Sequence, residues 1–165
     1  MLGIDPGTVR TGFGIVDSSD RDITVLTWGI VTSSPRLALG KRLHQIHTKL
    51  LALMDQWSPD QVAVEDPFVA RNPRAALAIG QAQGIALIVA AESGIEAIRY
   101  PPSQVKLAVT GYGGGTKDQV KRMVAIQLGL EEHDISEDAS DALAVALCHV
   151  RASNLSEILA KDRLQ

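Results

Sequence analysis

The sequence predicts an α/β protein with a mixed five-stranded sheet, antiparallel at the start of the chain, parallel later and flanked by helices. Three strand-like segments come first, and strands then alternate with helices along the 165 residues. The turn residues Pro6 and Gly7 join the first two segments closely enough for a hairpin. The predicted order is three strands, a helix, a strand, a helix, a strand and three helices.

The composition is typical of a single globular domain. Hydrophobic residues make up 45% of the chain and charged residues 21%. No apolar run approaches the roughly 20 residues of a membrane helix, and no signal-peptide pattern is present. The one cysteine, Cys148, cannot form an internal disulfide, which favours a cytoplasmic location. We expect one domain over residues 1–153 and a short tail over 154–165.

The net charge of −3 argues weakly against a polyanionic partner, but the charges are unevenly distributed. Residues 67–130 carry 7 basic and 3 acidic side chains, whereas residues 131–165 carry 3 basic and 8 acidic ones. The middle of the chain can therefore present a positive face to a polyanion while the C-terminal part gathers carboxylates.

Two of the predicted strands end on an acidic residue. The first strand ends at Asp5, and the fourth, over residues 61–65, ends at Glu65. Between them, β-branched residues predict strands over 13–16 and 23–32. Gly12 and Gly14 stand beside Asp5 in the hairpin, and we expect them to leave bare backbone there, which suits a metal-plus-phosphate site. The alternative is a hairpin turn with a solvated Asp5.

The first predicted helix follows Ser34 and Pro35, an N-cap residue followed by proline at the first helical position. Its apolar stripe includes Ile46 and Leu50 and predicts the buried face. His44 and His47 share a side of this helix. They are either a metal-binding pair or, more simply, a surface pair.

Residues 75–91 are predicted to form a helix that consists mainly of alanine and glycine. Gly80 and Gly84 are four residues apart, so they lie on one face and permit close backbone approach. The partner on that face is either the sheet or a second copy of the chain. A strand over 95–100 follows, and Ser103 is expected to cap the next short helix.

A glycine-rich segment over 111–115 separates that short helix from the next one. It resembles a phosphate loop but lacks the Walker pattern, so a flexible loop is the simpler interpretation. Thr116 and Gln119 form a capping box that starts a helix ending near residue 128. Lys106 and Lys117 flank the loop as candidate phosphate contacts.

The last predicted helix begins with Asp138 and Asp141, which project from one face of its first turn. Acidic residues there also serve as ordinary caps. Because strand ends and this helix start can converge, Asp5 and Glu65 are candidates to join them. Four close carboxylates stay ionised together when divalent cations neutralise them, and oxygen ligands favour Mg²⁺ or Mn²⁺. Two ions about 4 Å apart would suit phosphodiester hydrolysis.

An aromatic and two basic residues follow the Glu65 strand. Phe68 lies with Arg71 and Arg74 in a predicted loop. Phe68 is either a core residue or an exposed wedge that stacks on a nucleic-acid base.

Four segments together resemble the RuvC family of Holliday-junction resolvases, in the family's order and spacing. These segments are Gly3–Gly12, Ala63–Phe68, Gln104–Lys106 and Asp138–Ala144. The resemblance covers almost the whole chain. It implies a ribonuclease H-like fold and a homodimer that cuts two strands of a four-way DNA junction symmetrically. The implied products are 5′-phosphate and 3′-hydroxyl ends, formed with Mg²⁺ or Mn²⁺ in DNA recombination and repair.

The resemblance also implies residue roles and partners. Asp5, Glu65, Asp138 and Asp141 match the catalytic, metal-binding carboxylates of the family, and some relatives carry histidine at the Asp138 position. The resemblance implies DNA contacts at five further residues, namely Phe68, Arg71, Arg74, Lys106 and Lys117. The helix around Gly80 matches the dimer-forming helix, and the implied partners are the branch-migration proteins RuvA and RuvB. Asp66 adds an acid whose role the family does not explain.

Three rival interpretations remain at the level of sequence. A nucleotide-binding domain of the actin and sugar-kinase type also begins with a strand, Asp, Gly and Thr, but it needs a longer chain. A junction-binding protein without chemistry would not need four carboxylates. An RNA-processing enzyme with the same fold is closer, and Phe68 with the Asp138 and Asp141 pair favours DNA junctions over it.

Overall fold

A computed structural model describes residues 1–18, 22–66 and 73–162 of the chain. It contains a five-stranded sheet in the order β3-β2-β1-β4-β5. The strands are β1 (Leu2–Asp5), β2 (Arg10–Asp17), β3 (Thr24–Thr32), β4 (Val62–Glu65) and β5 (Ile98–Tyr100). Strands β1, β2 and β3 pair antiparallel, whereas β1, β4 and β5 pair parallel. The predicted mixed sheet is confirmed.

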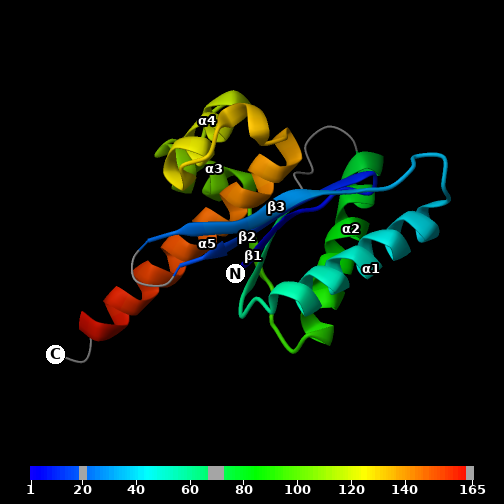
Figure 1. Cartoon of the computed structure of the whole chain (residues 1–165), viewed down its shortest axis with the longest axis horizontal. Helices are drawn as coiled ribbons and strands as arrows, with labels where there is room; N and C mark the ends of the chain where they lie inside the picture. Colours follow the sequence, from blue (N-terminus) through cyan, green and yellow to red (C-terminus); the bar gives the residue numbers. More distant parts are fainter. Residues whose placement is uncertain (19–21, 67–72, 163–165) are drawn as a thin grey trace.

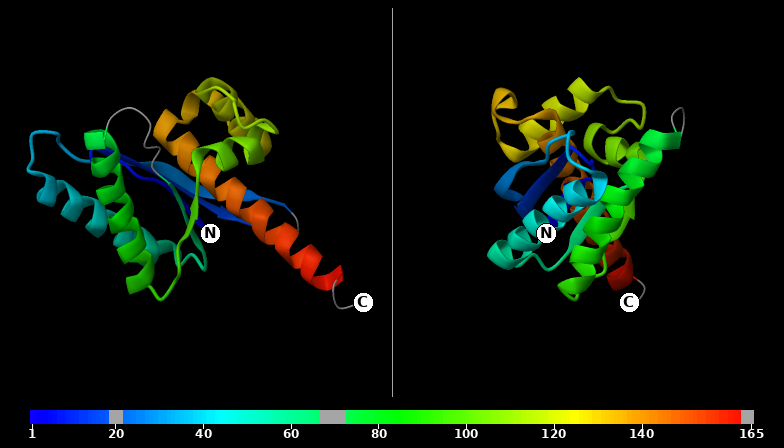
Figure 2. Two further views of the ribbon diagram at one scale, coloured as in Figure 1. Left: turned by 180° about the vertical axis from the view of Figure 1, so that it is seen from behind. Right: turned by 90° about the vertical axis from the view of Figure 1, so that its right-hand side faces the viewer.

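Helices cover both faces of this sheet (Figure 1). They are α1 (Leu39–Trp57), α2 (Pro73–Glu92), α3 (Pro102–Thr110), α4 (Lys117–Leu128) and α5 (Glu137–Asp162), with a 3-10 turn η2 (Glu132–Asp134) before α5. Helices α1 and α2 lie on one face, and α3, α4 and α5 lie on the other (Figure 2). None of the helices in the described part of the chain is long and apolar enough to span a bilayer.

Alternation along the central strands produces two cores. Leu2 and Ile4 on β1, with Val62 on β4, pack against Ile46 and Leu50 of α1. Intervening residues face the other side of the sheet, where α5 packs. Strand side chains alternate between faces, so each apolar run supplies both cores. The predicted apolar stripe of the first helix is confirmed.

Helix α5 lies directly on the backbone of β1 and β2, and glycines permit this contact. A Cβ added at Gly12 would overlap the carbonyl oxygen of Asp138, and one at Gly3 would overlap that of Ala142. At Gly14 an added Cβ would overlap the side chain of Leu143. The expectation that Gly12 and Gly14 leave bare backbone beside Asp5 is therefore wrong, because α5 covers both.

Several predicted boundaries also move. Helix α1 begins at Leu39 rather than near Ser34, and its N-cap residue makes no side-chain hydrogen bond. Pro101, not Ser103, precedes the first residue of α3. The capping box of Thr116 and Gln119 is confirmed at the start of α4. Helix α5 continues without a break through residue 162 (Figure 1), so residues 154–162 extend a helix.

The glycine face of α2 makes no close contact within the described chain. Cβ atoms added at Gly80 and Gly84 would have no atom of another element within 4 Å. The sheet is therefore not the close partner of these glycines. On α1, His47 lies 2.8 Å from a carboxylate oxygen of Glu92 and His44 is exposed, which agrees with a surface pair.

Candidate active site

A cavity of about 650 Å³ opens where β1 and β4 end and α5 begins. Four carboxylates line it. They are Asp5 at the end of β1, Glu65 at the end of β4, its neighbour Asp66, and Asp141 in the first turns of α5. Parallel pairing of β1 with β4 places the two strand ends at one edge of the sheet. The structure thus brings together three of the four predicted carboxylates, and Asp138 does not line this cavity.

The carboxylates of Asp5 and Glu65 perturb each other strongly. Burial, followed by the negative charges of Glu65 and Asp141, raises the pKa of Asp5 to about 8. Burial and the charge of Asp141 raise the pKa of Glu65 to about 7, although a hydrogen bond with Asp5 opposes that rise. The pair therefore holds a proton in the neutral pH range, where free carboxylates are ionised.

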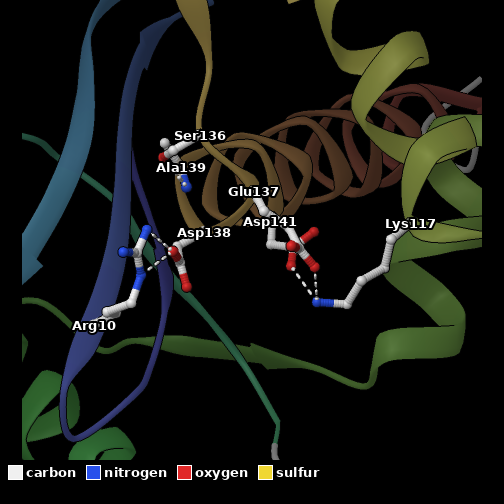
Figure 3. Close-up of polar contacts among 7 residues, drawn as sticks. All are labelled: Arg10, Lys117, Ser136, Glu137, Asp138, Ala139 and Asp141. Carbon is white, nitrogen blue, oxygen red and sulfur yellow. Dashed lines mark hydrogen bonds and ion pairs between the residues drawn. The ribbon is translucent and has the colours of Figure 1, made fainter. Parts of the chain in front are cut away.

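Asp141 is balanced by a lysine from α4 (Figure 3). The Nζ atom of Lys117 lies 3.4 Å from Oδ2 of Asp141 and 2.6 Å from Oε1 of Glu137. Burial raises the pKa of Asp141, and the nearby Lys117 charge acts against that rise. The hydrogen bond to Glu137, aided by the charge of Asp141, raises the pKa of Lys117. Lys117 therefore stays charged at the cavity wall.

Asp138 points away from Asp141 and meets an arginine from β2 (Figure 3). Nε and Nη2 of Arg10 each lie 2.6 Å from Oδ2 of Asp138. The cap of α5 is instead Ser136, whose hydroxyl accepts the backbone N–H of Ala139 at 3.3 Å. The side chain of Asp138 therefore does not cap the helix. It forms its ion pair with Arg10 at the edge of the site.

The donor set suits a hard divalent cation. Within residues 1–18, 22–66 and 73–162, no three His, Cys, Asp or Glu side chains stand in an arrangement that could hold an ion as drawn. A proton shared by Asp5 and Glu65, and the charge of Lys117 beside Asp141, neutralise the carboxylates in this arrangement. A cation can replace that proton, and the carboxylate oxygens of Asp5, Glu65 and Asp141 are ligands that fit Mg²⁺ or Mn²⁺.

This electrostatic arrangement predicts a pH-dependent stability. The folded pKa values of Asp5 and Glu65 exceed their ordinary values, so the folded protein binds more protons than the unfolded chain between about pH 4 and pH 8. The contribution of Asp5 and Glu65 to the free energy of unfolding is fully present at pH 4 and is lost as the pH rises through 8. We expect the melting temperature without divalent ions to fall by about 5 °C more in wild type than in Glu65→Gln between pH 5 and pH 8.

Differential scanning calorimetry with chelator measures this difference, and 10 mM Mg²⁺ should restore part of the loss at pH 8 in the wild type only. Equal pH slopes in wild type and Glu65→Gln would show that the pair does not hold its proton.

The predicted DNA contacts are placed unevenly. Lys106 and Lys117 line the cavity with the carboxylates, and Arg74 is exposed in the first turn of α2. Phe68 and Arg71 lie outside the described residues. The glycine-rich segment contributes Gly113 to the cavity wall, and a backbone hydrogen bond of 3.2 Å from Gly115 to Tyr112 closes its turn.

Several residues around the site were not predicted from the sequence. Arg10 lies within the first recognised segment, but nothing in its spacing indicated Asp138 as its partner 128 residues away. Glu137 was also missed, although it directly precedes Asp138. Gln83 of α2 contacts Glu65 and Asp66. The one local feature that could have indicated this role is a polar glutamine in a helix of mostly small residues.

Comparisons with known proteins agree on one family. The model of the family described as crossover junction endodeoxyribonuclease RuvC matches residues 1–149. A relative of that name from Syntrophomonas wolfei is 43% identical over 159 residues, covering 96% of this chain and 92% of the relative. Another, from Roseiflexus sp., is 38% identical over 162 residues, covering 98% and 96%.

Solved structures give the same result. Thermus thermophilus RuvC in complex with a Holliday junction substrate superposes with a TM-score of 0.86 at 35% identity, covering 94% of each chain. The yeast mitochondrial Holliday junction resolvase Ydc2, at 13% identity and a TM-score of 0.59 over 91% of this chain and 78% of Ydc2, shares the fold.

Proposed function

The chain belongs to the RuvC family of crossover junction endodeoxyribonucleases, and we propose that it resolves four-way DNA junctions by metal-dependent phosphodiester hydrolysis. The solved relative bound to a Holliday junction supports this substrate. The observation that carries the proposal is the meeting of Asp5, Glu65 and Asp141 at one cavity with Lys106 and Lys117. Carboxylates beside lysines suit an ion-assisted reaction on a phosphate backbone.

Asp5, Glu65 and Asp141 are our proposed metal ligands, with Asp138 completing the set. When bound, Mg²⁺ or Mn²⁺, as two ions in our proposal, supplies activation of water and stabilisation of the departing 3′ oxygen. Asp5 and Glu65 must release their shared proton for this role. Lys106 and Lys117 neutralise phosphates of the strand that enters the cavity.

We propose that the protein works as a homodimer through α2. Leu77 and Ile88 on this helix are 66% and 49% exposed, and they bracket Gly80 and Gly84 at helical spacing. An apolar helix face with bare backbone at its centre permits a second copy to approach closely. Two copies would present two cavities, as paired cuts require.

A bulky side chain at the centre of this face should separate the copies. Gly84→Leu is expected to raise the dimer dissociation constant by roughly tenfold or more, because the added side chain blocks backbone approach. Gly40→Leu on α1, where an added Cβ also meets nothing within 4 Å, is the matched control. Sedimentation equilibrium measures both, and an unchanged dissociation constant for Gly84→Leu would place the interface elsewhere.

Phe68 is our proposed base-stacking residue. We expect Phe68→Ala to lower junction cleavage by about tenfold, because a stacked base contributes about 1–3 kcal/mol. Binding of Mn²⁺ to the protein without DNA should be unchanged. Single-turnover cleavage and Mn²⁺ titration test the two expectations, and full cleavage by the variant would leave Phe68 as a core residue or a spectator.

The products of a cruciform plasmid test paired incision. We expect mostly linear DNA with nicks that ligase seals, since both strands are cut symmetrically before the complex dissociates and leave 5′-phosphate and 3′-hydroxyl ends. A product made mainly of nicked circles would contradict paired cutting, and Gly84→Leu should shift the product pattern from linear DNA towards nicked circles.

We further propose a cytoplasmic role beside the RuvA–RuvB branch-migration complex, with residues 1–153 as one nuclease domain.

A further inference from the structure

Asp66 is the acid that the proposed mechanism leaves without a role. It follows Glu65 directly and lines the same cavity as Asp5, Glu65 and Asp141. From its position, Asp66 is a candidate for a further metal ligand. The contacts of its side chain, however, are with residues of α2 and β5.

The side-chain amide of Gln83 on α2 joins Asp66 to Glu65. Nε2 of Gln83 donates to Oδ1 of Asp66 at 2.7 Å and to the backbone carbonyl oxygen of Glu65 at 3.2 Å. Both amide hydrogens are therefore used. Gln83 is only 7% exposed, so these bonds replace contacts with water that the buried amide has lost.

Strand β5 holds Asp66 from the other side. The backbone N–H of Asp66 donates to the carbonyl oxygen of Tyr100 at 2.8 Å, which extends the β4–β5 ladder one step beyond Glu65. A guanidinium nitrogen of Arg99 lies 3.8 Å from the same Asp66 oxygen that accepts from Gln83. The end of β4 is therefore fixed by α2 and by β5 together.

We propose that Gln83 and Asp66 are positioning residues that fix the end of β4 and so aim the carboxylate of Glu65 into the cavity. Asp66 acts as a hydrogen-bond acceptor for Gln83 and does not bind metal. This inference rests on the proposed function, because it takes Glu65 to be a metal ligand. Groups that orient metal ligands typically change metal affinity or activity by roughly 10–100-fold when removed.

Three variants separate an acceptor from a ligand. Asp66→Asn keeps an oxygen that can accept from Gln83 but removes the charge, whereas Asp66→Ala removes both. Gln83→Met keeps the length of the side chain and removes its two donors. Mn²⁺ affinity is measured on each dimer without DNA, from the electron paramagnetic resonance signal of free Mn²⁺. The constants kcat and KM are measured on a four-way junction.

We expect Asp66→Asn to stay within about threefold of wild type in Mn²⁺ affinity and kcat. Asp66→Ala and Gln83→Met should each lose roughly tenfold in Mn²⁺ affinity and in kcat. KM should be unchanged, because only the orientation of the Glu65 carboxylate changes. Melting temperatures establish that each variant is folded, and if Gln83→Met unfolds, the two Asp66 variants decide.

Two results would overturn the inference. If Asp66→Asn loses as much Mn²⁺ affinity as Asp66→Ala, Asp66 binds the ion through its charge. If Asp66→Ala and Gln83→Met both match wild type, neither residue positions Glu65. Glu65→Gln distinguishes these failures from failure of the proposed function. Full cleavage by Glu65→Gln would remove Glu65 from the reaction, whereas an inactive Glu65→Gln beside a fully active Gln83→Met would reject only the positioning role.

Discussion

Asp5→Asn is expected to lower four-way-junction cleavage by roughly 1,000-fold or more while leaving junction affinity within about threefold of wild type. In our proposal this carboxylate holds the ion, and the ion contributes several kcal/mol of transition-state stabilisation, at about 1.36 kcal/mol per tenfold in rate. We propose that DNA affinity depends instead on cationic side chains such as Lys106 and Lys117. Single-turnover cleavage in Mg²⁺ and a binding titration in Ca²⁺ measure the two quantities.

The same substitution should stabilise the folded protein. Burial and the neighbouring Glu65 and Asp141 charges oppose ionisation of Asp5, and an uncharged amide removes that penalty. We expect the melting temperature at pH 8 without divalent ions to rise by about 3 °C. Asp55→Asn, at an exposed position of α1, is the control and should change neither cleavage nor stability. Full cleavage by Asp5→Asn would remove Asp5 from the catalytic set.

Gly12→Ala is expected to destabilise the protein by about 3 kcal/mol, which corresponds to a melting temperature roughly 10 °C lower. An added methyl group overlaps the backbone carbonyl oxygen of Asp138, and backbone cannot rotate away as a side chain can. The start of α5 must therefore move off β2. Since Asp141 lies on that first stretch of helix, cleavage at 20 °C should also fall, by about 100-fold for a displacement near 1 Å.

Gly40→Ala is the matched control, because an added Cβ there meets nothing within 4 Å. It should keep full cleavage and gain a little stability from helix propensity. Thermal melting and single-turnover cleavage measure both variants. A Gly12→Ala protein as stable and active as wild type would mean that α5 does not need its close seat on β2.

Local patterns were enough to predict the sheet and the carboxylates. The acidic residues Asp5 and Glu65 end apolar strands, so the rule that ligands gather at the carboxyl ends of parallel strands placed them together. The capping box at Thr116 needed only a spacing of three residues. Predictions of this kind succeed because their physical cause lies within a few residues of the chain.

Features that depend on distant contacts could not be predicted. The glycines at 12 and 14 looked like open backbone because the helix that covers them lies about 130 residues later. The ion pair of Asp138 with Arg10 of β2 joins residues 128 positions apart, so spacing within the helix could not indicate it. The role of Gln83 likewise depends on how α2 packs beside β4, which no local pattern encodes.

Selectivity among nucleic-acid substrates separates a junction resolvase from other nucleases of the same fold. The protein is incubated with a synthetic four-way junction, a linear duplex of the same sequence and an RNA–DNA hybrid, each in Mg²⁺, in Mn²⁺ and in chelator. We expect symmetric paired cuts in the four-way junction only, with either ion, and no product in chelator. Cleavage of the RNA–DNA hybrid in preference to the junction, or equal cleavage of the linear duplex, would contradict this expectation.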